Sequence, residues 1–266
     1  MIGKPNVHID ASRRAIPLSA RDISQARELL RALIHKELKL KYRQTLLGCG
    51  WALFQPAALA LVVTYFVSNR GLGRTPLGVF QAVLPWQLFA YVVNQTSRSL
   101  LVQQSLIKKV FFPRLLLPLA STLIGAIDYG IGLFAFILAA VFFRLDLLHA
   151  AVYFPWLLLL TLLFAFATGL WVCALTVRYR DLHHALPFLV QLSFFLTPIA
   201  YSRGETERGL LVFNPLTGII EGCQSAFAGQ PVFTEALGYS VTLTTILLVS
   251  GLFYFRRVEA TLDDHL

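Results

Sequence analysis

Six stretches of this chain are long and apolar enough to cross a lipid bilayer, and no other feature restricts the fold as much. Crossing a hydrocarbon core of ~30 Å takes about 20 helical residues, since each residue adds ~1.5 Å. Hydrophobic residues make up 56% of the chain and charged residues only 14%, against roughly 25% charged residues in soluble domains. We therefore expect an all-α membrane protein with six transmembrane helices, at residues 46–67, 79–101, 115–143, 150–177, 185–201 and 237–255.

The distribution of basic residues predicts the orientation of these helices. Most of the 23 Lys and Arg residues precede residue 46, lie in the second and fourth connections, or follow the last crossing. Because Lys and Arg collect in cytoplasmic loops, both termini should be cytoplasmic. The net charge of +9 then reflects topology and contact with anionic membrane lipids, and no nucleic-acid partner is expected. The opposite side holds Arg70, Arg74, Arg144, Arg203 and Arg208.

The transmembrane domain, residues 46–257, is preceded by two distinct segments. Residues 1–18 are polar and should form an irregular arm. Residues 19–45 predict an amphipathic helix on the cytoplasmic interface, because apolar residues recur every three to four positions between charged ones. A soluble helix packed on another domain is the alternative, although this sequence contains no second soluble domain. Residues 258–266 would form a cytoplasmic tail.

The connection between the fifth and sixth crossings, residues 202–236, is too broken to cross the bilayer. It suits one or two short helices that re-enter the outer leaflet. Such irregular backbone is tolerated at membrane depth only against protein or a water-filled cavity. This indicates a pathway through the protein.

Asp128 lies midway along the third predicted crossing. A charge at the bilayer centre costs roughly 2.5–3.5 kcal/mol on insertion scales, so such residues usually face the bundle interior. Asp128 is either a functional residue or the donor or acceptor of a structural hydrogen bond to a neighbouring helix. Small residues four positions apart, Ala126 with Gly130 and Ala165 with Gly169 and Cys173, predict close helix packing.

Aromatic side chains recur on the first, second and fifth crossings. Aromatic faces stack on sugar rings, which suits a surface along which a glycan slides. The alternative for each residue is an ordinary position in the core or against lipid. The candidates are Tyr65, Phe66, Trp86, Phe89, Phe194 and Phe195.

The second connection reads QQSLIKKVFFPRLLLP over residues 103–118. A short helix over 106–112 would present Lys108 and Lys109 on one side, and Pro113 would interrupt it. The segment is a docking surface or a set of basic anchors for the ends of two crossings. The sequence has no GxxxxGK[ST] phosphate-binding loop, no HExxH or GxSxG motif and no Cys/His pair at metal spacing. We expect neither a catalytic residue nor a metal site nor a cofactor in this chain.

Six segments, taken in order, resemble the membrane subunit of bacterial ABC exporters for polysaccharides of the Wzm and TagG type. These segments are KYRQT with LG and WALFQP at residues 41–56, LPW at 84–86, LIKKVFFPR at 106–114, VRYRD at 177–181, FLTPI at 195–199 and NPLTG at 214–218.

The resemblance implies a homodimer docked on two copies of a separate ATPase that binds ATP and Mg²⁺. The coupling segment would include Leu106, Lys108, Lys109, Phe111, Phe112 and Arg114, and the outer gate Asn214, Pro215 and Glu221. A channel between the subunits, lined partly by the first and fifth crossings, would pass the polymer, with the aromatic candidates and Asp128 as channel residues.

The expected function is therefore export of a lipid-linked polysaccharide, O-antigen-like or capsular, across a bacterial inner (cytoplasmic) membrane. A teichoic acid exporter of the same family is the first alternative. A membrane-embedded glycosyltransferase or a passive channel is less consistent with these motifs.

Overall fold

The computed structural model describes residues 20–43, 45–68, 75–108, 112–144, 147–179, 181–199 and 214–260. Within these ranges the chain forms helices and turns and no strand, which confirms the all-α prediction. The helices are α1 (Ala20–Tyr42), α2 (Trp51–Ser68), α3 (Pro76–Val102), α4 (Gln104–Ile107), α5 (Leu116–Phe142), α6 (Leu147–Arg178), α7 (Leu182–Phe195), α8 (Pro215–Phe227) and α9 (Glu235–Ala260), with a 3₁₀ turn at Gly48–Gly50.

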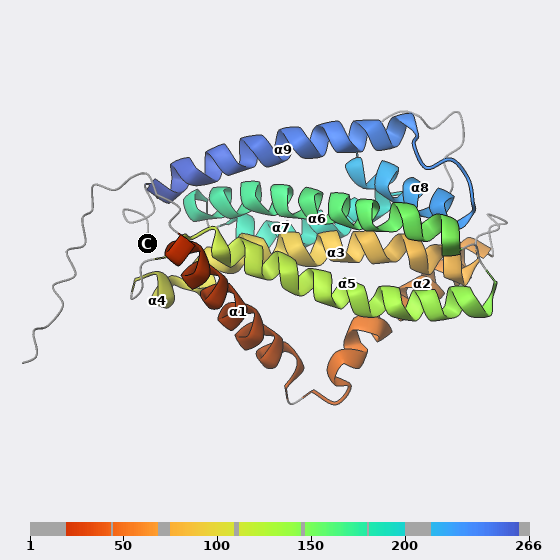
Figure 1. Ribbon diagram of the computed structural model, residues 1–266, viewed down its shortest axis with the longest axis horizontal. Coiled ribbons are helices and arrows are strands. Elements are labelled where there is room, and N and C mark those ends of the chain that lie inside the picture. The colour runs from red at the N-terminus through yellow and green to blue at the C-terminus, as the bar shows by residue number, and fades with distance from the viewer. Residues whose placement is uncertain are drawn as a thin grey trace, which may run out of the picture.

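The long helices form a bundle in which α3, α5, α6 and α9 run side by side along the molecule (Figure 1). Helix α1 crosses this bundle obliquely at one end, and α8 lies at the other end. Of the described segments, five are long and apolar enough to span a bilayer, and they coincide with five of the six predicted crossings. They are Gly48–Val67, Pro76–Val102, Leu116–Phe142, His149–Arg178 and Glu235–Glu259.

The segment predicted as the fifth crossing, residues 185–201, forms a shorter helix than expected. Helix α7 has 14 residues, which gives a length of ~21 Å. It ends at Phe195, and turns follow at residues 196–199. Pro198 explains this early end, because a proline disfavours helical backbone at the preceding residue, here Thr197.

Three helix boundaries also differ from the prediction. Helix α1 ends at Tyr42, whereas the amphipathic helix was expected to continue to residue 45. Leu46 and Leu47, expected in the first crossing, precede a turn in which Gly48 has a φ of +50°. Glycine adopts this left-handed conformation without the clash that a side chain causes. Helix α9 continues to Ala260, into the predicted tail.

Helix α3 is the central helix and packs against α2, α5, α6, α7 and α8. Close packing is possible where small residues face it: a Cβ atom at Gly169 would lie 2.9 Å from Thr96 Cβ. The small-residue face at Ala165, Gly169 and Cys173 is therefore confirmed as a packing face. The pair Ala126 and Gly130 is different, because a Cβ at Gly130 would meet nothing within 4 Å.

Two apolar clusters form the core. The larger one follows α3 and α6 to the end where α8 lies. The smaller one joins α1, α3, α5, α6 and α9 at the other end and includes Leu33, Leu100, Phe112, Leu117 and Phe255. Helix α1 is thereby fixed to the bundle through Leu33, whose side chain is only 4% exposed.

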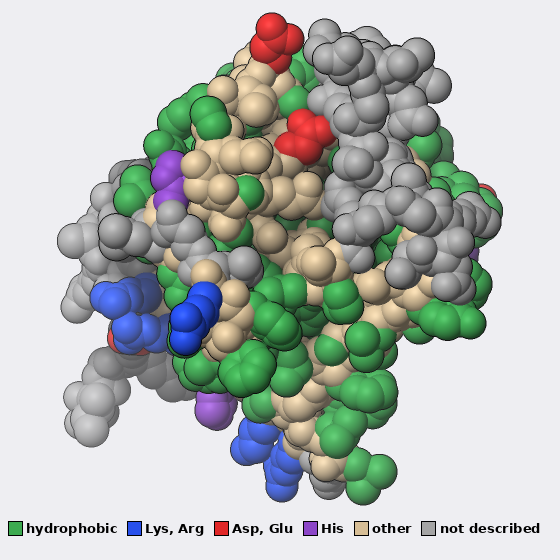
Figure 2. Space-filling model, turned by 90° about the vertical axis from the view of Figure 1, so that its right-hand side faces the viewer, with side chains coloured by type: hydrophobic (Ala, Val, Ile, Leu, Met, Phe, Trp, Pro, Cys, Tyr) green, Lys and Arg blue, Asp and Glu red, His purple; other side chains and the backbone are tan. Residues whose placement is uncertain are grey.

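Figure 2 looks onto the end of the molecule that holds α8. Acidic side chains lie in its upper part, and hydrophobic side chains cover much of its lower part. Helix α8 buries most of its residues, among them Pro215, Leu216, Ile219 and Ile220, between α3, α6 and α9. It is thus part of the packed core at this end.

Candidate functional site

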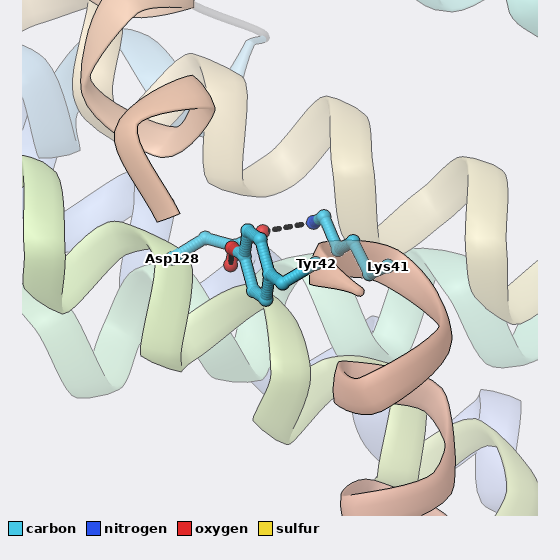
Figure 3. Close-up of polar contacts among 3 residues, drawn as sticks. All are labelled: Lys41, Tyr42 and Asp128. Atoms are coloured by element: carbon cyan, nitrogen blue, oxygen red, sulfur yellow. Dashed lines mark hydrogen bonds and ion pairs between the residues drawn. The ribbon is translucent and has the colours of Figure 1, made fainter. Parts of the chain in front are cut away.

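Asp128 lies ~18 Å along α5 from its first residue, near the middle of a helix that can span the bilayer. A carboxylate at this depth needs partners, because an unpaired charge in a medium of low dielectric constant is costly. The Lys41 ammonium forms an ion pair with one carboxylate oxygen. The Tyr42 hydroxyl donates a hydrogen bond to the other oxygen (Figure 3).

Both partners of Asp128 come from the last turn of α1. The apolar side of α1 packs through Leu33 on the cluster at the end of the bundle, and α1 contacts α5 along its course. Its final residues therefore reach the middle of α5. The Lys41 ammonium also lies 3.9 Å from the centre of the Tyr91 ring on α3, a geometry in which the ring face attracts the cation.

Titration of Tyr42 reflects this environment. Burial raises the pKa of the Tyr42 phenol, and the hydrogen bond to Asp128 and the negative charge of that carboxylate raise it further. The phenol therefore stays protonated and keeps its donor role over the physiological pH range. Lys41, Tyr42 and Asp128 together form what we call the α1–α5 polar cluster.

A small cleft lies beside the α1–α5 polar cluster. Polar and apolar side chains from α1, α2, α3 and α5 line it. The side chains of Lys41 and Asp128 remain 33% and 18% exposed in it. These ammonium, amide, phenol and carboxylate groups can donate hydrogen bonds to, or accept hydrogen bonds from, hydroxyl groups and water. The lining includes Lys41, Gln55, Gln87, Tyr91 and Asp128.

The sequence predicted Asp128 as a candidate but missed both of its partners. Lys41 and Tyr42 stand in the KYRQT segment, which carries a family resemblance and no obvious chemistry by itself. The pairing could have been predicted from two features: a single acidic residue within a span, and a basic residue at the end of an amphipathic helix. Within the described residues, no three His, Cys, Asp or Glu side chains converge as metal ligands do.

The predicted channel aromatics occupy three kinds of position. Tyr65, Phe66 and Phe195 are largely exposed on α2 and α7. Trp86 and Phe194 are half-buried and touch edge to face, with ring centres 4.8 Å apart. The Trp86 indole N–H has no hydrogen-bond acceptor among the described residues.

Phe89 is different from these aromatics, because its ring stacks on Phe164 in the core and is 8% exposed. Its position is that of a packing residue in this chain. The assignment of all six aromatics to a channel stays a prediction.

The predicted coupling segment begins with α4, which ends at Ile107 instead of continuing to residue 112. Lys108 is exposed, Leu106 is half-buried, and Lys109 and Phe111 lie outside the described residues. Phe112 is 8% exposed and belongs to the apolar cluster shared with Leu100 and Leu117. Its ring therefore packs within this chain.

Arg114, the last residue of the segment, is joined to α9. Its backbone N–H donates to Glu259 Oε1 at 3.1 Å, and its guanidinium Nη1 donates to the Glu259 carbonyl oxygen at 2.9 Å. Glu259 was assigned to the tail by the sequence prediction and was not recognised as a partner. No sequence spacing links two residues so far apart.

The predicted outer gate residues lie at and within α8. The Asn214 side chain accepts from the Leu216 N–H and donates to the Leu196 carbonyl and Thr197 Oγ1, so it caps α8 and joins it to the end of α7. Pro215 occupies the first turn, where its missing N–H costs nothing. Glu221 is half-buried on α8.

Hydrogen bonds hold α8 to two neighbouring helices. Gln81 Nε2 on α3 donates to the Cys223 carbonyl oxygen at 2.5 Å. Ser240 Oγ on α9 donates to the Pro215 carbonyl oxygen at 2.7 Å. These two polar residues were also missed, because Gln and Ser inside apolar helices carry little sequence signal.

Comparison with known proteins gives one family and several relatives. Residues 28–228 match the family described as ABC-2 type transporter. The chain is 28% identical over 254 residues to an O-antigen export system permease protein RfbA of Myxococcus xanthus, across 90% of this chain and 96% of that protein. It is 22% identical over 239 residues to a protein of the same name from Klebsiella pneumoniae, across 87% and 92%.

Proposed function

This chain belongs to the ABC-2 type transporter family, and from that premise we propose that it is the permease subunit of an ABC exporter for a lipid-linked polysaccharide. The observation that carries the proposal is the alignment with O-antigen export permeases over nearly their whole length. An O-antigen-like glycan is accordingly the first cargo to test. The sequence contains no GxxxxGK[ST] phosphate-binding motif. We therefore propose that a separate ATPase binds ATP and Mg²⁺.

The proposed topology has six crossings with both termini in the cytoplasm of a bacterium. Five long apolar helices support it. Helix α7 is apolar but too short for a full crossing of ~30 Å, so it would form only part of the fifth one. Helix α8 would then be the re-entrant outer segment, which agrees with its burial against α3, α6 and α9.

The permease would act as a homodimer, with the polymer passing between two copies. Helices α2 and α7, the first and fifth crossings in this topology, carry exposed aromatic side chains. Tyr65, Phe66 and Phe195 would offer ring faces to successive sugars without holding any one of them tightly. A continuous path of this kind suits a chain too long for an enclosed pocket.

Energy would enter at the segment from Leu106 to Arg114. Lys108 is exposed beyond α4, and the basic character of the segment would complement acidic groups on the ATPase. Movement of this segment would shift helices around the channel, and the α1–α5 polar cluster would keep the interface helix in register with α5.

The function can be tested by deleting the gene in its host and measuring polysaccharide on the two faces of the inner membrane. We expect lipid-linked glycan to accumulate on the cytoplasmic face and to disappear from the cell surface. Complementation with this chain should restore export only when the partner ATPase is active. Unchanged surface glycan after deletion would contradict the proposed cargo class.

A further inference from the structure

Arg114, at the end of the coupling segment, makes two hydrogen bonds to Glu259 on α9. Each residue contributes a backbone and a side-chain group, and the two donor–acceptor distances are 3.1 and 2.9 Å. The last carbonyl groups of a helix have no partner within the helix. The Arg114 guanidinium satisfies one of them at the end of α9, so the contact also caps this helix.

Apolar packing reinforces this contact. Phe112, two residues before Arg114, shares a buried cluster with Phe255 on the last turns of α9. Phe255 is 2% exposed and Phe112 is 8% exposed. A displacement of the coupling segment therefore moves the end of α9 or breaks both polar and apolar contacts.

The other end of α9 is fixed to α8. Ser240 Oγ donates to the Pro215 carbonyl oxygen at 2.7 Å. The backbone of Gly218 lies so close to Ala236 that a Cβ atom would collide with the Ala236 carbonyl oxygen. Contacts this tight leave little room for α8 to move independently of α9.

Between these ends α9 is a continuous helix along the whole bundle (Figure 1). It has no internal proline, whereas α2, α3, α6 and α7 each contain one. Prolines are the usual positions of sharp kinks. Ser240 and Glu259 are ~29 Å apart along the helix axis. Trp171 Nε1 on α6 donates to Ser250 Oγ at 3.1 Å, which guides the middle of α9 along α6.

We infer that Glu259 is a positioning residue for the coupling segment and that α9 transmits movement of this segment to α8 at the outer end. The inference rests on the proposed function, since it assumes an ATPase at one end and an outer gate at the other. Coupling of this kind needs a packed element that both ends bias, and contiguity alone does not establish it. The test must therefore measure coupling and not stability alone.

The first experiment uses the permease–ATPase complex in lipid nanodiscs to measure ATP hydrolysis and in proteoliposomes to measure glycan export. In Glu259→Ala we expect hydrolysis within twofold of the wild type and export reduced about tenfold, within the usual range of coupling between sites. Glu259→Gln should retain export, because its amide oxygen still accepts from the Arg114 N–H. Arg257→Ala, an exposed neighbour on the same turn, is the matched control and should behave as the wild type.

The second experiment reports on α8 directly. Cys49 is exposed, whereas Cys173 and Cys223 are buried, so a Cys49→Ser background allows one introduced thiol at Ala228→Cys, just after α8. We expect nucleotide to change its labelling rate with a membrane-impermeant maleimide. Glu259→Ala should abolish this change, and so should Ser240→Ala at the opposite end of α9. Ser240→Ala keeps the test valid if Glu259→Ala fails to fold.

The possible outcomes distinguish failure of the α9 inference from failure of the proposed function. Nucleotide-dependent labelling that is unchanged in both Glu259→Ala and Ser240→Ala would overturn transmission through α9. Equal loss of hydrolysis and export in Glu259→Ala, with no rescue by Glu259→Gln, would overturn the positioning role. A wild-type complex that neither exports glycan nor responds to nucleotide would instead contradict the proposed function.

Discussion

Lys41 at the end of α1 forms an ion pair with Asp128 at the middle of α5. The pair joins the amphipathic helix α1 to a helix that can span the bilayer. The Tyr42 hydroxyl donates a hydrogen bond to the carboxylate, and the Tyr91 ring lies against the ammonium. Both charges are partly exposed to a cleft, so the surrounding dielectric constant lies between that of water and that of the bilayer interior. The attraction between the two charges is therefore weaker than in a fully buried pair.

We predict that Lys41 and Asp128 are energetically coupled. Lys41→Ala leaves the carboxylate without its cation and should lower the free energy of unfolding by about 2–3 kcal/mol, below the full cost for a deeply buried pair. The apolar double substitution Lys41→Met with Asp128→Leu should recover most of this loss. Thermal unfolding of the single and double variants in nanodiscs measures the coupling energy. Strictly additive effects would show that the two residues act independently.

A second prediction concerns the pH dependence of stability at Glu37 on α1. Burial raises the pKa of Glu37, while a hydrogen bond from Gln103 and the nearby Lys36 lower it by less. The unfolded chain then releases this proton at lower pH than the folded protein does, beginning near the ordinary Glu pKa of about 4.3. Between the two pKa values the folded state holds more protons, so the free energy of unfolding falls as pH rises.

Glu37→Gln should remove this decline. The measurement compares unfolding from pH 4 to pH 7 in the wild type, Glu37→Gln and Glu28→Gln, in which an exposed acid of the same helix is changed. The difference between Glu37→Gln and the wild type should grow with pH in favour of the variant. A constant difference across the range would mean that the pKa of Glu37 is the same in both states.

The sequence predicted the helices of this protein better than the contacts between them. Long apolar runs specify spans through hydropathy alone, and five were placed correctly. The fifth crossing was predicted to be short and close to a proline-rich end, and α7 ends at Phe195, just before Pro198. The partners of Asp128 and Arg114 were missed because Lys41 and Glu259 are distant in sequence, and helical periodicity does not show which helices meet or at what depth.

The close approach of α8 to α9 gives a third prediction. A Cβ atom at Gly218 would collide with the Ala236 carbonyl oxygen and Ser240 Oγ. Gly218→Ala should therefore cost about 1–3 kcal/mol of stability through overpacking. Gly130→Ala on α5, where a Cβ meets nothing within 4 Å, is the control and should be neutral or stabilising by up to about 1 kcal/mol. Similar thermal stabilities for the two variants would contradict the tight α8–α9 contact.

A fourth prediction separates channel aromatics from core aromatics. The double substitution Tyr65→Ala with Phe66→Ala removes two exposed rings and should reduce glycan export several-fold while folding and ATP hydrolysis persist. Phe89→Ala removes a ring stacked on Phe164 and should lower the free energy of unfolding by about 3–5 kcal/mol. Export assays and thermal unfolding distinguish the two effects. Full export without Tyr65 and Phe66 would remove them from the proposed glycan path.

The last prediction concerns the coupling segment. Substitution of its exposed residue should affect ATPase binding, whereas substitution of its buried residue should affect the stability of the permease. Lys108 is exposed, so Lys108→Glu should weaken binding to the ATPase by charge reversal and should cost less stability than loss of a buried ring. Phe112 is buried with Leu100 and Leu117, so Phe112→Ala should destabilise the permease by about 3 kcal/mol or more, with or without the partner. Pull-down of the ATPase and unfolding of the isolated permease measure both quantities. Normal ATPase binding by Lys108→Glu would place the docking contact elsewhere on the permease.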